Sequence, residues 1–247
     1  MLNSQSQQYP HPYQALDVIY QDAELVAINK PSGLLVHRSP IDKRETRFAV
    51  QELRNQLGQH VYPLHRLDKP TSGVLVFALS SEAASFYNEQ FREHQIHKTY
   101  LALVRGHGPE TMFIDHALKD EVDDYAGVKA GGEAKDALTN VKCLHQFDIP
   151  LTVDRYPTTR LSLMQCEPVT GRKHQIRRHL KHIGHPIIGD SRHGKGMLNR
   201  ACEDYLGAGR LWLACTQMVL TGRNGNNVVI NAPLEADFER VLTQLSS

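Results

Sequence analysis

HRLDKPTSGVLVFAL, residues His65 to Leu79, joins a polar loop directly to an almost wholly apolar run. The Pro-Thr-Ser-Gly segment is typical of a turn. The apolar run that begins at Gly73 is typical of a strand covered on both faces of a sheet. The stretch therefore predicts a loop at the end of a central strand. It leaves two roles open for Asp68, which is either a turn residue that accepts main-chain N–H bonds or a carboxylate placed for chemistry.

The segments on both sides of this stretch alternate between strand and helix patterns, which predicts an α/β (α+β) fold. We expect a flexible tail at residues 1–14 and a single domain at residues 15–247, because no Pro- or Ser-rich linker divides the chain. A Gly/Ala/Lys-rich segment at 126–136 predicts a mobile surface excursion. Strands are predicted at 16–30 (a hairpin), 73–79, 98–106, 160–168, 210–220 and 227–230, and helices at 47–57, 80–95, 170–184 and 235–245.

The composition of the 247-residue chain is that of a globular protein, with 22% charged residues and a net charge of +1. No apolar run is long enough to cross a membrane, and the first residues do not form a signal peptide. The four cysteines are far apart and include no CxxC pair, so we expect thiols in a reducing compartment. These features predict a cytoplasmic protein without a membrane partner.

The neutral total conceals a strong separation of charge. Residues 160–200 hold nine Lys or Arg and five His against two Asp or Glu, whereas residues 115–136 hold seven acids against three bases. A basic face of this kind suits a phosphate-rich ligand such as RNA.

The predicted helix at 170–184 is the centre of the basic segment. Its start, near Thr170 or Gly171, would offer main-chain N–H groups and cations to a phosphate, although a solvated basic face explains the pattern equally well. Arg177 differs from its neighbours because it follows Ile176 on the apolar stripe of the helix. A guanidinium at the edge of a packed face should have a partner, since an unpaired buried charge is costly. The cations in this segment are Arg172, Lys173, Arg177, Arg178 and Lys181.

Other residues allow more than one interpretation. Four histidines, His174, His179, His182 and His185, could suggest a metal, but they lack an HExxH pattern and a nearby cysteine, so we expect no metal site. Tyr100 lies on a predicted strand, where a tyrosine more often has a structural role than a place in an active site.

Several motifs, taken in order, resemble the RluA-type pseudouridine synthases. These motifs are KPSGLLVH (30–37), HRLDKPTSGVLVFALS (65–80), HKTYLALVRG (97–106), EPVTGRKHQIRRHL (167–180) and HPIIGD (185–190). The resemblance implies a mixed, mostly antiparallel central sheet around an RNA cleft, with no separate RNA-binding domain. It implies a monomer that needs no metal and no organic cofactor. The branch that it resembles most modifies uridine 65 of tRNA, and ribosomal RNA is the alternative substrate.

The resemblance also implies roles for individual residues. Asp68 would be the catalytic aspartate, Tyr100 the tyrosine that stacks on the target base and helps to remove a proton, and Arg177 the partner of the aspartate. Arg66 would enter the space left by the flipped nucleotide. The remaining RNA contacts are expected from Lys30, His65, Arg172, Lys173, His174 and Arg178.

The chemistry of this isomerisation suits a chain with one conspicuous carboxylate. Asp68 could attack the sugar, attack the base, or remove a proton from C2′ of the sugar to give a glycal. Glycoside hydrolysis normally needs two carboxylates, and no second acid lies near Asp68 in this stretch of sequence, which disfavours a hydrolase. Leu67 and Val74 are expected to be apolar walls that exclude water. A module that binds tRNA without catalysis remains the alternative.

Overall fold

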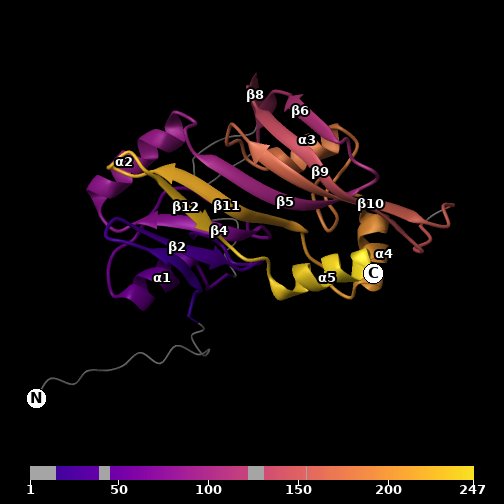
Figure 1. Ribbon diagram of the computed structural model, residues 1–247, viewed down its shortest axis with the longest axis horizontal. Coiled ribbons are helices and arrows are strands. Elements are labelled where there is room, and N and C mark those ends of the chain that lie inside the picture. The colour runs from indigo at the N-terminus through magenta and orange to yellow at the C-terminus, as the bar shows by residue number, and fades with distance from the viewer. Residues whose placement is uncertain (1–14, 39–44, 122–130, 154) are drawn as a thin grey trace, which may run out of the picture.

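The computed structural model describes residues 15–38, 45–121, 131–153 and 155–247. Within these ranges a ten-stranded sheet has the order β1-β2-β4-β11-β5-β10-β9-β6, with β3 beside β4 and β12 beside β11 (Figure 1). Its pairs are antiparallel except β4 with β11, so the predicted mixed, mostly antiparallel sheet is confirmed. The bounds are β1 Val18–Gln21, β2 Leu25–Lys30, β3 Tyr62–Pro63, β4 Ser72–Ala78, β5 His97–Arg105, β6 Thr111–Asp115, β9 Leu138–Ile149, β10 Thr159–Pro168, β11 Leu213–Thr221 and β12 Asn227–Asn231.

Helices cover the sheet in two groups that correspond to two apolar clusters. In the first cluster, Ala49 and Leu53 of α1 pack with the residues of β2 and β4. In the second, α4 and α5 lie together beside the end of the sheet, where Trp212 packs against Phe238 (Figure 1). None of the helices described here is long and apolar enough to cross a membrane. The helices are α1 Ala49–Leu57, α2 Ser81–Arg92, α3 Gln175–His182, α4 Gly196–Leu206 and α5 Ala236–Ser246.

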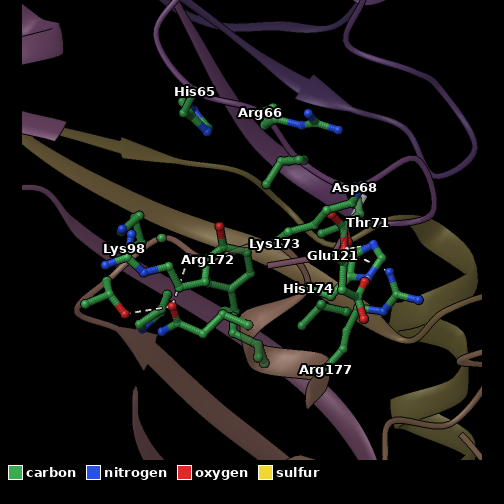
Figure 2. A pocket seen from close by; sticks show the side chains of 18 of the residues that line it. His65, Arg66, Asp68, Thr71, Lys98, Glu121, Arg172, Lys173, His174 and Arg177 are labelled. Carbon is green, nitrogen blue, oxygen red and sulfur yellow. Dashed lines mark hydrogen bonds and ion pairs between the residues drawn. The ribbon is translucent and has the colours of Figure 1, made fainter. Parts of the chain in front are cut away.

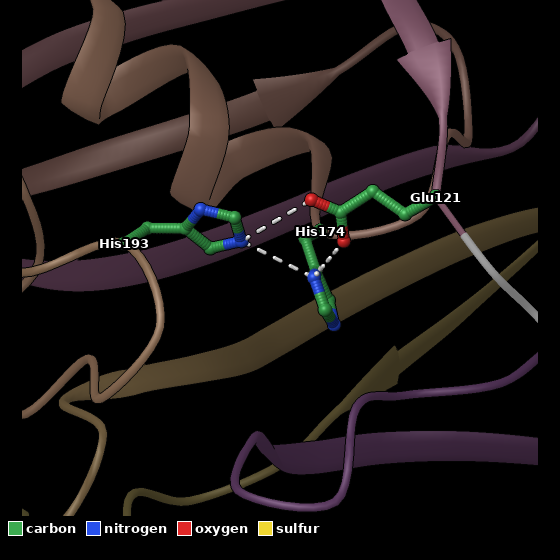
Figure 3. Close-up of side chains that lie close together, drawn as sticks. All are labelled: Glu121, His174 and His193. Atoms are coloured by element: carbon green, nitrogen blue, oxygen red, sulfur yellow. Dashed lines mark hydrogen bonds and ion pairs between the residues drawn. The ribbon is translucent and has the colours of Figure 1, made fainter. Parts of the chain in front are cut away.

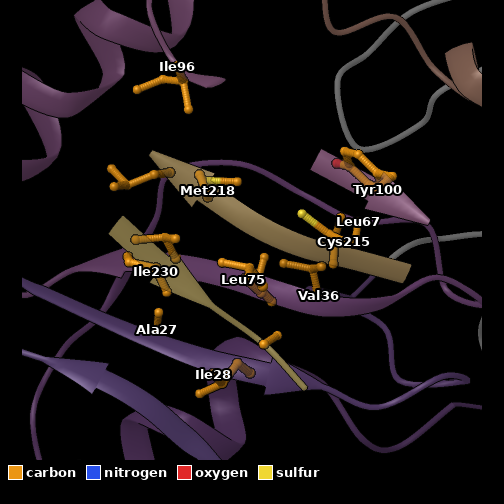
Figure 4. Close-up of a cluster of buried hydrophobic side chains, with 14 of the residues drawn as sticks. Ala27, Ile28, Val36, Leu67, Leu75, Ile96, Tyr100, Cys215, Met218 and Ile230 are labelled. Carbon is orange, nitrogen blue, oxygen red and sulfur yellow. The ribbon is translucent and has the colours of Figure 1, made fainter. Parts of the chain in front are cut away.

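Strand β4 lies at the centre of the first cluster, which Figure 4 shows in part. All seven of its residues are buried, and it pairs with β2 on one side and β11 on the other. The apolar run after Asp68 therefore forms a strand covered on both faces, as its composition predicts.

Gly73 allows β4 to approach β11 closely. Its φ is +104°, a conformation that L side chains rarely adopt, and a Cβ atom there would overlap the main-chain carbonyl of Cys215. Gly73 also pairs in register with Cys215 across the parallel junction. The glycine of the Thr-Ser-Gly turn is therefore required by the junction of the two strands, which lies next to the loop that carries Asp68.

The structure differs from the sequence predictions in several places. Helix α3 begins at Gln175, not near Thr170, because the hydroxyl of Thr170 hydrogen-bonds to Gln175 and to the main chain of Leu138 instead of capping a helix. Strand β9 and helix α4 were not predicted. Part of the predicted mobile excursion is a regular strand, β8 (Gly131–Lys135), which pairs with β7 (Leu118–Asp120). Residues 126–130 and the predicted tail at 1–14 lie outside the described residues.

Candidate active site

Asp68 lies on the loop between β3 and β4, and its carboxylate is not what closes the turn. The main-chain N–H of Thr71 donates to the main-chain carbonyl of Asp68 at 3.0 Å. The carboxylate oxygen Oδ2 instead accepts a hydrogen bond from Nη1 of Arg177 at 2.9 Å. The side chain is therefore directed at a cation from a distant segment and does not accept the main-chain N–H that closes the turn.

A second loop, the KPSG segment, supports the Asp68 loop. Nζ of Lys30 donates to the main-chain carbonyls of Pro31, Leu34 and Lys69, at 2.8, 2.9 and 3.1 Å. The N–H of Gly33 also donates to Lys69 at 2.9 Å. Lys30 is completely buried, and burial lowers the pKa of its amine to about 7. The expectation that Lys30 contacts RNA is therefore wrong, and its amine instead ties the two loops together.

Arg177 is held by a second carboxylate, Asp190, which is buried. Nε and Nη2 of Arg177 donate to the two oxygens of Asp190 at 2.8 and 2.9 Å, while Nη1 reaches Asp68. Burial opposes the charge of Arg177, but the hydrogen bonds to Asp190 and the nearby charge of Asp68 raise the pKa of the guanidinium above its usual value. The expected pairing of Arg177 with Asp68 is present, and the bidentate contact fixes its direction.

Tyr100 reaches the same pocket from β5. The side chain is 9% exposed, and burial together with the neighbouring Cys215 raises its pKa well above the usual value. The phenol is therefore neutral at physiological pH. It lines the pocket, and its side chain also contacts the thiol of Cys215.

Asp68, Tyr100 and Arg177 line a pocket of about 590 Å³, shown in Figure 2. Asp68, His174 and Arg177 are grouped on one side of the view and Lys98 on the other. Leu67 contributes an apolar wall as predicted, whereas Val74 is in the core and does not line the pocket. The volume is within the usual range for small-molecule sites of about 300–1,000 Å³. The pocket also includes the predicted RNA-contacting residues Arg66, His65, Arg172, Lys173 and His174.

The basic residues have different environments. Arg66 is exposed, whereas His65 stacks on Phe91 and accepts a hydrogen bond from the N–H of Val76, and burial lowers its pKa to about 3. His65 is therefore a neutral part of the wall. Arg172 and Lys173 are half-buried on the segment before α3.

Arg178 is separated from this group. Its guanidinium donates to the main-chain carbonyl of Lys119 at 3.0 Å, and it does not line the pocket. The expectation that Arg178 contacts RNA therefore finds no support at the pocket, where the structure gives it a partner on β7.

The histidines considered for a metal do not gather. His179 is buried between the hydroxyl of Thr139 and the carbonyl of His116, and His182 stacks on His116 at 3.7 Å. His185 bonds to the carbonyl of Arg105. His174 is on the other side of the helix start, in the pocket.

Sequence reasoning missed the acids that surround Asp68. Asp190, Glu121 and His193 received no role, although Asp190 ends a motif that was recognised. The expectation that no second acid lies near Asp68 is incomplete, because Glu121 lines the same pocket and Asp190 shares Arg177 with Asp68. Their distance in sequence concealed them, and the acidic composition of 115–136 was the available signal for Glu121.

Comparison with known proteins gives this geometry a family. A model of the RNA pseudouridylate synthases matches residues 24–182. The chain belongs to this family. The synthase is therefore an isomerase. It is 46% identical over 232 residues to a protein named tRNA pseudouridine synthase C from Vibrio cholerae, covering 93% of this chain and 95% of that one. It is 49% identical over 208 residues to a protein of the same name from Pasteurella multocida, covering 83% and 86%.

Solved structures agree with this assignment. Human RNA Pseudouridylate Synthase Domain Containing 4 superimposes with a TM-score of 0.71 and 25% identity, covering 93% of each chain. Human RNA Pseudouridylate Synthase Domain Containing 1 has the same fold, with a TM-score of 0.69, 24% identity, and coverage of 97% of the synthase and 98% of that chain. The family match includes Asp68, Tyr100 and Arg177 but ends before Asp190 and His193.

Proposed function

We propose that the synthase converts uridine to pseudouridine in tRNA and that Asp68 is its catalytic carboxylate. The observation that carries the proposal is the ionic contact of Asp68 with Arg177 at 2.9 Å, inside a pocket large enough for one flipped nucleotide. The relatives named tRNA pseudouridine synthase C, which align over nearly the whole chain, support tRNA as the substrate. We propose position 65, in the acceptor-side stem, as the modified uridine.

The reaction breaks the C1′–N1 bond and forms a C1′–C5 bond, after which C5 loses a proton and N1 gains one. No atom or electron is added, so the residues of the pocket have three tasks: to hold the base, to exclude water and to supply an ionised carboxylate. Arg177 donates a hydrogen bond to the carboxylate of Asp68 and fixes its rotamer. Attack on the sugar, attack on the base and removal of the C2′ proton all use this same group.

The base must leave its stack before it can react, which costs a few kcal/mol. We assign Arg66 to the space that the nucleotide leaves, because it is exposed and lines the pocket close to Asp68 in sequence. Tyr100 would stack on the uracil as a neutral phenol. Arg172 and Lys173, on the segment before α3, would contact the phosphates on either side.

The same fold would then both bind RNA and carry out the reaction, as a monomer without a separate RNA-binding domain. A tRNA substrate also implies a compartment that contains tRNA, and we propose the cytoplasm.

The experiment that tests Asp68 uses Asp68→Asn and Asp68→Ala with an unmodified tRNA transcript. Both variants should bind tRNA with near-normal affinity and should lose turnover by roughly 10³-fold or more, as expected when a nucleophile or base is removed. Asp148→Asn is the matched control, because the side chain of Asp148 is 58% exposed. An Asp68 variant that still converts uridine would refute the assignment.

The product separates isomerisation from the alternatives. Mass spectrometry of the digested tRNA should show pseudouridine without free uracil, whereas a glycosidase would release uracil. A binding module would give neither product. Mapping of pseudouridines in cells with and without the synthase identifies the RNA, and a signal lost from ribosomal RNA instead of tRNA would contradict the proposed substrate.

A further inference from the structure

Glu121, His174 and His193 bring three ligand atoms together beside the pocket (Figure 3). They come from three segments: Glu121 follows β7, His174 precedes α3, and His193 follows the buried Asp190. Oε2 of Glu121 is 2.9 Å from Nδ1 of His174, which is 3.2 Å from Nε2 of His193. Nε2 of His193 is 3.9 Å from Oε1 of Glu121.

These distances suit a small tetrahedral cation. An ion with bonds of about 2.0–2.1 Å to nitrogen and oxygen holds its ligand atoms about 3.3 Å apart, and the three distances lie on both sides of that value. Two histidines with one glutamate are also a known set of zinc ligands that leaves a fourth position open. The donor types and their spacing therefore agree.

The electrostatics agree as well. Oε2 of Glu121 is buried and accepts no well-directed hydrogen bond within the described residues. Arg192 competes for this oxygen from 3.3 Å, but 55% of its side chain is exposed, so it can turn towards solvent.

The ligands are held in place before any ion binds. The backbone of His174 is left-handed, with a φ of 54°, which is unusual for a residue other than glycine and is typical of functional sites. Asp190 accepts the main-chain N–H of His193 at 2.9 Å. The side chains of His174 and His193 are only 11% and 10% exposed.

We propose that Glu121, His174 and His193 form a binding site for a divalent transition metal of the zinc class, linked to Asp68 through His174. With Nδ1 on the metal, the proton of the imidazole is on Nε2, which lies 3.8 Å from Oδ2 of Asp68. This separation is longer than a hydrogen bond, so the N–H would act on Asp68 as a nearby dipole; the other N–H of a metal-bound histidine commonly faces a carboxylate. His174 is one of the four histidines for which the sequence predicted no metal site, so this proposal departs from that expectation.

Occupancy should slow the synthase. A bound ion adds positive charge and a fixed N–H donor beside Asp68, and both make the carboxylate less reactive. This consequence depends on the proposed role of Asp68, whereas the metal site itself does not.

The binding test uses the whole synthase, stripped with a chelator and without RNA. Calorimetry with Zn²⁺ should give about one equivalent bound, and Co²⁺ should give the visible absorption of a tetrahedral site. Glu121→Gln and His193→Gln, each checked for native circular dichroism, should weaken binding at least about 10-fold. His182→Ala is the matched control from the stacked pair with His116 and should bind normally. Equal binding by all variants, or no binding by the wild type, overturns the site.

The link to Asp68 is tested separately. Saturating Zn²⁺ should lower the turnover of the wild type at least about 5-fold and the turnover of His193→Gln much less. Equal turnover of the wild type with and without Zn²⁺ overturns the link. Asp68→Asn should still bind Co²⁺. If Asp68→Asn keeps both its activity and Co²⁺ binding, the proposed role of Asp68 is contradicted and the metal site is not. If Asp68→Asn is inactive but the wild-type synthase binds no metal, the metal site is contradicted and the proposed role of Asp68 is not.

Discussion

Removal of Asp190 by the substitution Asp190→Ala should be among the most damaging single changes in the molecule. It removes two charge-assisted hydrogen bonds, at 2.8 and 2.9 Å, from an arginine whose side chain is 6% exposed. It also leaves the main-chain N–H groups of Arg192 and His193 without their acceptor. Loss of one partner of a buried ion pair costs about 3–5 kcal/mol. In a chain of this length each kcal/mol lowers the melting temperature by roughly 2–4 °C, so we expect a loss of about 6–20 °C.

The assay is thermal unfolding followed by circular dichroism, with Asp148→Ala as the matched control. Asp148 is 58% exposed and contacts Arg160 at 3.6 Å, and such surface pairs contribute about 0.2–1 kcal/mol. Although burial opposes ionisation, Arg177 holds the pKa of Asp190 below its usual 3.8. Its contribution is therefore complete above about pH 4 and is lost at lower pH, where the difference between wild type and Asp190→Ala should narrow. A loss of stability no larger than that of the control would refute this account.

Two further substitutions test the scaffold of the Asp68 loop. Lys30→Met removes the three hydrogen bonds of this amine and should reduce turnover. Burial lowers the pKa of Lys30 from 10.5 to about 7, so the unfolded chain binds more protons between those values, and the wild type should gain stability over Lys30→Met as the pH rises from 7 to 9. The opposite trend in melting temperatures would contradict the lowered pKa of this buried amine. Gly73→Ala should lower the free energy of unfolding, measured by chemical denaturation, by at least about 2 kcal/mol, because its Cβ would overlap Cys215. Gly58→Ala is the control: Gly58 has a φ of +66° and open space around it, so this change should cost about 1 kcal/mol. Equal losses would show that backbone conformation, not contact with β11, sets the cost.

The sequence predicted best those features that depend on local pattern. The apolar run of β4 could be recognised as a buried strand because every position is apolar or small. Helix α2 was equally clear, since Ser80 caps it by accepting the N–H of Ala83 at 3.1 Å. That Arg177 must have a partner was also foreseeable, because an unpaired charge beside Ile176 is energetically costly, although the residues nearby did not identify that partner. Each of these inferences needs only a few neighbouring residues.

Features that depend on distant segments were not predicted. Lys30 has the sequence context of a surface lysine, and nothing near it shows that three carbonyls from two loops surround its amine. Glu121 and His193 meet only because β7 and the segment after Asp190 converge on the start of α3. The start of α3 was misplaced for the same reason: Thr170 has the composition of a helix cap, but its hydroxyl is occupied by a partner on another strand.

The way in which Arg177 divides its donors bears on the role proposed for Asp68. Two of its nitrogens are fixed on Asp190, so a single donor, Nη1, remains for Asp68. One guanidinium thus contacts two carboxylates. Its single positive charge can balance only one of the two acids. The contacts of Arg177 and His174 with Asp68 both fall on Oδ2, which leaves Oδ1 outside this network of described residues. A full bidentate pair would have neutralised Asp68 on both oxygens. If Asp68 acts as proposed, the buried Asp190 supports catalysis by occupying most of the arginine, so that a single guanidinium nitrogen orients Asp68.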